Sequence, residues 1–88
     1  MKEELYWLEP PDPEELAKLP LHRAGGFSDA TELAEQVRAG GAFLADLEEA
    51  GPEVAQRILD FLCGAVWLAG GRIRKLSAWT YLITPPED

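Results

Sequence analysis

The segment that most constrains this chain is residues 61–69, which is apolar at every position. Pro52 and Glu53 suit the start of a helix through this segment, because proline fits the first helical position and an acid offsets the helix dipole. Gly70 suits its end, where glycine adopts the left-handed cap conformation cheaply. Polar side chains occupy only the first half of this helix, so its second half has no wet face. Such a helix must be covered on both sides, and we expect the second cover to be another copy of the chain.

Length and charge narrow the possible functions further. The chain has 88 residues, enough for one small domain, and its 47% hydrophobic content is typical of a globular protein. Its formal net charge of -8 argues against nucleic acid as a partner, because neutralising phosphates requires a basic surface. The apolar segment is much shorter than the ~20 residues that span a membrane.

Residues 1–18 differ from the rest of the chain. Six of the sixteen acidic residues lie within the first fifteen positions, and prolines stand at 10, 11 and 13. We expect an acidic, extended arm with one helical turn at residues 13–16, followed by a core domain at 19–88. The arm carries one apolar group at residues 5–8. Because its charge would be repelled by anionic lipid, we expect no direct membrane binding by this chain.

The hydrophobic pattern of the core predicts the element order β-α-β-α-β-β. Strands are expected at 19–23, 42–45, 72–76 and 80–84, and helices at 28–39 and 52–69. Right-handed crossovers would make three strands parallel and the last one antiparallel, with both helices on one face. The predicted fold is therefore a two-layer α/β sandwich with a mixed sheet. Pro20 restricts the first strand to an edge or a strand start.

Few residues of this chain suit catalysis. His22 is the only histidine and Cys63 the only cysteine, which is too few for a zinc site. The glycine pairs lack the spacing of a phosphate-binding loop. We therefore expect no enzyme activity, no metal and no cofactor.

The C-terminal hairpin holds the better candidate site. Trp79 and Tyr81 are two residues apart and are therefore expected on one face of their strand. In the preceding strand, Lys75 interrupts the alternation of polar and apolar residues. Together they could form a shallow apolar pocket with a charged rim, to which Arg72 and Arg74 contribute. Ordinary sheet packing beside an exposed lysine is the alternative, and the residues alone leave both open.

Residues 28–85 resemble the conserved core of SepF, the bacterial cell-division protein that tethers FtsZ filaments to the membrane and helps to organise the septum. The resemblance covers about two-thirds of the chain, and the 55–66 motif is its most specific part. The matching segments are Ala30, Leu33 and Ala34, then 42–47, 55–66, 70–71, 73–76 and 81–85.

This resemblance implies a cytoplasmic, non-enzymatic adaptor at the division septum. It implies an α/β sandwich that dimerises and assembles further, partly through helix faces where a small residue matching Gly64 matters. The residues we expect in self-association are Phe61, Gly64, Ala65, Trp67 and Leu68.

The resemblance also implies a pocket near the last strands for the acidic-hydrophobic C-terminal tail of FtsZ. Family contacts of basic and aromatic type match Lys75 and Tyr81. The acidic residues 1–18 depart from the basic amphipathic helix with which family members usually start, and residues 4–8 themselves have the character of such a tail. The alternative function is a small regulatory domain that binds a metabolite or another protein, which would need a polar-lined cavity.

Overall fold

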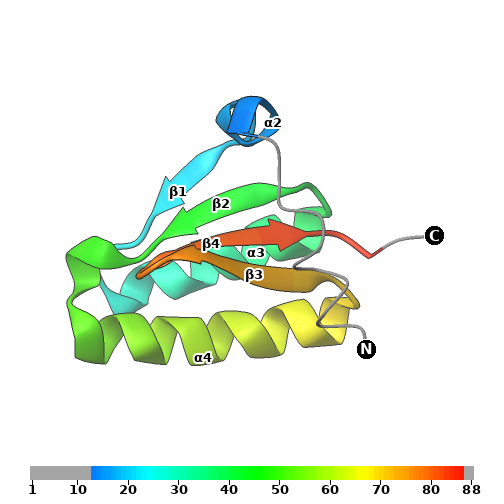
Figure 1. The fold of residues 1–88 in the computed structure, drawn as a ribbon. Helices are drawn as coiled ribbons and strands as arrows, with labels where there is room; N and C mark the ends of the chain where they lie inside the picture. Colours follow the sequence, from blue (N-terminus) through cyan, green and yellow to red (C-terminus); the bar gives the residue numbers. More distant parts are fainter. Residues whose placement is uncertain (1–12, 87–88) are drawn as a thin grey trace, which may run out of the picture.

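The computed structural model describes residues 13–86, which form a four-stranded sheet with two helices on one face (Figure 1). Two short 3-10 turns, at Phe27–Asp29 and Glu48–Ala50, precede the two long helices. The elements in chain order are α2 (Pro13–Ala17), β1 (Leu21–Arg23), α3 (Ala30–Ala39), β2 (Phe43–Asp46), α4 (Pro52–Ala69), β3 (Arg72–Ser77) and β4 (Thr80–Thr84).

The strands lie in the order β1-β2-β4-β3. Strands β1 and β2 are parallel, and β4 is antiparallel to both of its neighbours, β2 and β3. Three strands therefore share one direction and the last one opposes them, as predicted, and the two-layer α/β sandwich is confirmed. The expected helical turn after the prolines is also present, as α2. The rest of the predicted arm, residues 1–12, lies outside the described residues.

Local signals at both ends explain the length of α4. The helix begins at Pro52, after Gly51 with a φ of 82°, and the N–H of Ala55 donates to the Gly51 carbonyl at 2.8 Å. It ends at Gly70, whose φ of 79° lies in the left-handed region that glycine favours. The N–H of Gly70 donates to the Trp67 carbonyl at 3.1 Å, which closes the last turn.

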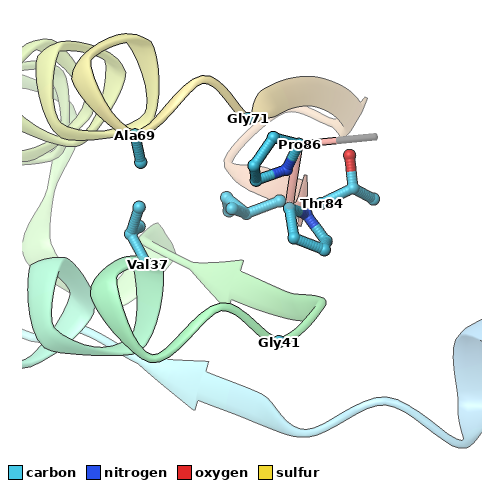
Figure 2. A pocket seen from close by; sticks show the side chains of 8 residues that line it. Val37, Gly41, Ala69, Gly71, Thr84 and Pro86 are labelled. Atoms are coloured by element: carbon cyan, nitrogen blue, oxygen red, sulfur yellow. The ribbon is translucent and has the colours of Figure 1, made fainter. Parts of the chain in front are cut away.

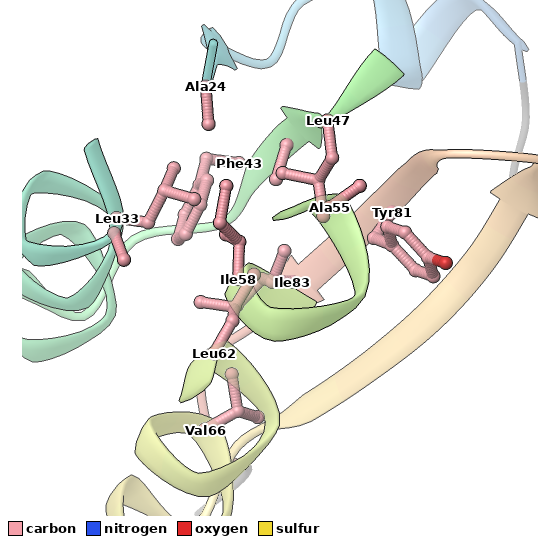
Figure 3. Packing of buried hydrophobic residues seen from close by; sticks show 12 residues of the cluster. Ala24, Leu33, Phe43, Leu47, Ala55, Ile58, Leu62, Val66, Tyr81 and Ile83 are labelled. Atoms are coloured by element: carbon pink, nitrogen blue, oxygen red, sulfur yellow. The ribbon is translucent and has the colours of Figure 1, made fainter. Parts of the chain in front are cut away.

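The core lies between the helices and the two central strands (Figure 3). The register places Phe43 of β2 opposite Ile83 of β4, and Ala45 opposite Tyr81. One stripe of α4 packs on these side chains and is fully buried. Its members recur at the three- and four-residue spacing of a single helix face: Ala55, Ile58, Leu62 and Val66.

Gly71 allows the end of α4 to pass close to β4, and this contact generates a prediction. A Cβ at Gly71 would lie 2.5 Å from the backbone carbonyl oxygen of Thr84, whereas a Cβ at Gly41 would meet nothing within 4 Å. We expect Gly71→Ala to lower the free energy of unfolding by about 1–3 kcal/mol, the usual cost of overpacking. Gly41→Ala is the matched control. Urea unfolding measures both, and equal stabilities of the two variants would contradict the close-approach argument.

Candidate functional site

The C-terminal hairpin pairs a cation with an aromatic residue. Lys75 of β3 lies directly opposite Tyr81 of β4, just before a register shift between Lys75 and Ser77. Lys75 is exposed, but Tyr81 is only 5% exposed and belongs to the core cluster. Figure 3 shows the Tyr81 ring beside the core, with its hydroxyl oxygen pointing away from the other labelled side chains. Only this hydroxyl edge is therefore available to a partner.

Trp79 stands at the same end of the sheet, but it lies in the turn between β3 and β4 and not, as the spacing predicts, on the strand with Tyr81. Its side chain is half-buried and packs against the core, and its carbonyl accepts a hydrogen bond of 2.8 Å from the N–H of Leu47. Both aromatic residues of the predicted apolar pocket thus contribute to the stability of the fold. Their additional role in binding a peptide stays a prediction, and Trp79 has more exposed surface than Tyr81.

The structure separates the basic residues that the sequence places in one cluster. Arg72 lies opposite Thr84, and Arg74 lies opposite Leu82. Because successive strand residues point to opposite faces, Arg72 and Arg74 share the face opposite the helices, whereas Lys75 points to the helix side with Tyr81. The two arginines therefore do not surround the same surface as Lys75, which corrects the expectation of a single charged rim.

The outer face of α4, which we define as Phe61, Gly64, Trp67 and Leu68, lies away from the sheet. Trp67 is 81% exposed and Leu68 86%, and the Phe61 side chain is also exposed. Ala65 is half-buried beside this face. The predicted self-association residues therefore gather on one side of the helix. Within one copy of the chain, the sheet covers only the inner side of α4. The outer face, which its apolar sequence predicts to be covered as well, is exposed to solvent.

Phe27 extends this apolar surface, and the sequence analysis missed it. Its ring lies edge-on to that of Phe61, with 6.0 Å between ring centroids, and the Arg57 guanidinium lies 5.1 Å from the Phe27 centroid. Phe27 stands in a 3-10 turn that no helical periodicity includes. An apolar residue directly after Gly25-Gly26 was the only available signal.

Within residues 13–86, two ionisable groups with clearly raised pKa values, Cys63 and Tyr81, lie where α4 meets the hairpin. Burial, and secondarily the carboxylate of Asp60, raises the pKa of the Cys63 thiol above its ordinary 9.0. Burial, and secondarily the charge of Cys63, raises the pKa of the Tyr81 hydroxyl above its ordinary 10.0. Both groups are held neutral, so this thiol lacks the lowered pKa of a reactive cysteine.

A small hollow lies at the end of the helix layer, between the ends of α3, α4 and β4 (Figure 2). Val37 and Ala69 face each other across one side of it, and Thr84 and Pro86 line another. Its volume is about 10 Å³, room for about one water molecule. This hollow is too small and too apolar to hold a metabolite.

Within residues 13–86, histidine, cysteine and carboxylate side chains form no group of three that could ligate a metal ion. Among the helices of the same residues, none combines the length and the apolarity that a membrane crossing requires.

Comparison with known proteins gives consistent results. A family model described as "Cell division protein SepF" matches residues 22–87. The Cell division protein SepF of Halalkalibacterium halodurans is 36% identical over 69 residues, which are 78% of this chain and 46% of that protein. Cell division protein SepF 3 of Streptomyces coelicolor is 40% identical over 63 residues, which are 72% of this chain and 46% of that protein. The chain thus spans less than half the length of these two relatives.

Two solved structures share the fold. A SepF-like protein from Archaeoglobus fulgidus has a TM-score of 0.68 at 19% identity, covering 76% of this chain and 83% of that one. A SepF-like protein from Pyrococcus furiosus also has a TM-score of 0.68, at 17% identity, covering 89% and 93%. At such low identity the likeness shows the fold alone.

The raised pKa values of Cys63 and Tyr81 predict how stability depends on pH. Each neutral group contributes stability that is complete below its ordinary pKa and is lost as the pH rises through the raised pKa. We therefore expect the free energy of unfolding to fall above about pH 9. The Cys63→Ser, Tyr81→Phe double variant should lose less stability over this range, measured by urea unfolding at several pH values. An equal fall in both proteins would assign the effect to other groups.

Proposed function

The chain belongs to the SepF family of cell division proteins, and from this premise we propose that it is a non-enzymatic adaptor of the division septum. In this proposal the protein self-associates through the outer face of α4 and binds the acidic-hydrophobic C-terminal tail of FtsZ at the β3–β4 hairpin. The single observation that carries the proposal is the bare apolar outer face of α4. A contiguous exposed patch of this kind marks an interaction surface.

Self-association is supported by both shape and chemistry. Gly64 has no side chain, and a Cβ built there would meet nothing within 4 Å, so another helix can approach α4 closely at this point. Phe61, Trp67 and Leu68 surround Gly64 with large apolar side chains. A second copy of the same face would bury them, and aromatic side chains such as Trp67 dominate the energetics of interfaces.

Binding of the FtsZ tail is supported by the family relationship and by the chemistry of the hairpin. An acidic, partly apolar peptide needs a cation beside an apolar surface. Lys75 supplies an exposed cation, and Trp79 supplies a half-buried ring at the same end of the sheet. Arg72 and Arg74, on the other face of β3, contribute long-range attraction and no direct contact with this surface.

The non-enzymatic part of the proposal rests on where the reactive side chains lie. His22 packs edge-on against Phe43, with 5.5 Å between ring centroids, and this contact joins β1 to β2. Cys63 is held as a neutral thiol. Neither lies in the small hollow described above, so no nucleophile or base faces a space that a substrate could enter there.

The outer face of α4 predicts the oligomeric state. We expect a dimer at micromolar concentration, and we expect Trp67→Glu to raise the dissociation constant roughly thirtyfold, because losing an aromatic hot spot costs about 2 kcal/mol or more. Gly64→Lys should also weaken the dimer, because it places an unpaired charge in the buried surface. Thr31→Glu, at an exposed site on α3, is the control for Trp67→Glu and should leave the dimer intact. Analytical ultracentrifugation tests this, and a monomeric parent protein would refute it.

The hairpin predicts an order of effects on peptide binding. Lys75→Glu should weaken binding of the FtsZ tail peptide roughly thirtyfold, since disrupting a desolvated charge pair costs about 2 kcal/mol or more. Arg72→Glu is the matched charge reversal and should have a smaller effect. Tyr81→Phe tests the hydroxyl edge and retains the ring, whereas Tyr81→Ala would cost about 3–5 kcal/mol of fold stability. Calorimetry measures affinity, and full-affinity binding by Lys75→Glu would place the site elsewhere.

A further inference from the structure

We propose that the face of the sheet opposite α3 and α4, which we call the open face, is the docking site of the chain's own residues 1–12. The open face is defined by three leucines and two arginines: Leu21, Leu44, Leu82, Arg72 and Arg74. This inference is independent of peptide binding at the hairpin. It gives the acidic N-terminal segment a defined place on the molecule.

The first observation is an apolar row that crosses the sheet. The strand register places Leu21 opposite Leu44, Leu44 opposite Leu82, and Leu82 opposite Arg74. The three leucines therefore cross β1, β2 and β4, and Arg74 continues the row onto the edge strand β3. Within the described residues, both long helices lie on the other face of the sheet (Figure 1). Leu82 in the middle of the row is 8% exposed and Leu44 is half-buried, whereas Leu21 at the end of the row is 46% exposed and offers apolar surface to a further cover.

The second observation is that charge divides between the two layers. The sheet side carries three arginines, Arg23, Arg72 and Arg74, and one acid, Asp46, which lies 3.6 Å from Arg23. The exposed charged residues of α3 and α4 are mostly acidic: Glu32, Glu35, Glu53 and Asp60, against Arg38 and Arg57. An acidic segment is therefore attracted to the open face and repelled by the helix layer.

The composition of residues 1–12 matches this face. The segment holds four acids and one lysine, and it has four consecutive apolar residues at positions 5–8. A leucine-rich row that ends in arginines offers apolar contact and opposite charge to the same short segment. The outer face of α4 is also apolar, but the exposed charges of the two long helices are acidic by four to two, so that layer attracts an acidic segment less than the open face does.

The segment is also long enough. It joins α2, which lies beyond the edge strand β1 at the top of Figure 1 and leads into β1 through Leu19 and Pro20. Twelve extended residues reach up to about 40 Å, whereas four strands span only about 15 Å between their outer axes. Because the segment is tethered, its effective concentration at the open face is on the order of millimolar. Modest complementarity therefore suffices for docking.

Paramagnetic broadening in the full chain tests this placement. A nitroxide is attached at Glu4→Cys in a Cys63→Ser background, and amide signals are compared with and without reduction of the label. We expect strong loss of the Leu44, Leu82 and Arg74 amide signals, and little loss at Trp67 and Leu68. Broadening concentrated on α4, or spread evenly over the molecule, would overturn the proposal.

Mixing distinguishes the chain's own segment from that of another copy. Isotope-labelled protein without a nitroxide is mixed with unlabelled protein that carries it. The proposal expects the open-face signals to remain in this mixture. Their loss would show that the segment comes from a second copy, and would overturn the proposal.

Charge reversal supplies the matched control. Arg74→Glu should reduce the docked population about two- to fivefold, as expected from an exposed charge contact of up to about 1 kcal/mol. Arg38→Glu makes the same change on the helix layer and should leave the broadening unchanged. Equal effects of the two variants would contradict docking at the open face. Native amide dispersion in each spectrum shows that the variant is folded.

Discussion

The structure depends on the contact between one stripe of α4 and the two central strands. Ile58, Leu62 and Val66 lie on Phe43 and on neighbouring side chains of β4, fully shielded from water. Burying a side chain of this size contributes about 1.5–3 kcal/mol. Because this stripe occupies a single face of the helix, the contact also determines which residues of α4 remain outside. The exposure of Trp67 and Leu68 is a direct consequence of the packing of Leu62 and Val66.

The pleat of β3 decides which of its basic residues can act together. Lys75 follows Arg74 directly, yet the two side chains point to opposite faces of the sheet. A shift of one residue in the pairing of β3 with β4 would exchange these faces. The register therefore assigns the lysine to the hairpin surface beside Tyr81 and the arginines to the open face. Two kinds of acidic ligand can thus be attracted to the same strand without sharing a contact.

The two layers of the sandwich differ in charge as well as in structure. The helix layer is apolar at the C-terminal half of α4 and acidic around it, which favours a second copy over an acidic peptide. The open face combines a leucine row with Arg72 and Arg74, which favours an acidic, apolar segment. The proposed assembly through α4 and the proposed docking on the sheet therefore use separate surfaces and do not compete.

The sequence by itself determined the elements and their directions. Pro52 and Gly70 mark the ends of the long helix through local backbone rules, and the hydrophobic pattern locates the strands within about two residues. The three parallel strands and the antiparallel fourth, together with the group of apolar residues on α4, could also be predicted, because each follows from short-range periodicity or from simple connection rules.

Only the tertiary structure decided where these elements lie relative to one another. In the structure β4 lies between β2 and β3, and Tyr81 is buried in the core. Lys75 and Arg74 lie on opposite faces of the sheet. Spacing in the sequence predicted that Trp79 and Tyr81 share one side of a strand, but it did not show that Trp79 lies in the turn before β4 or that the Tyr81 side faces the core. That choice depends on pairing between strands more than thirty residues apart in the chain, and local propensity carries no information about it.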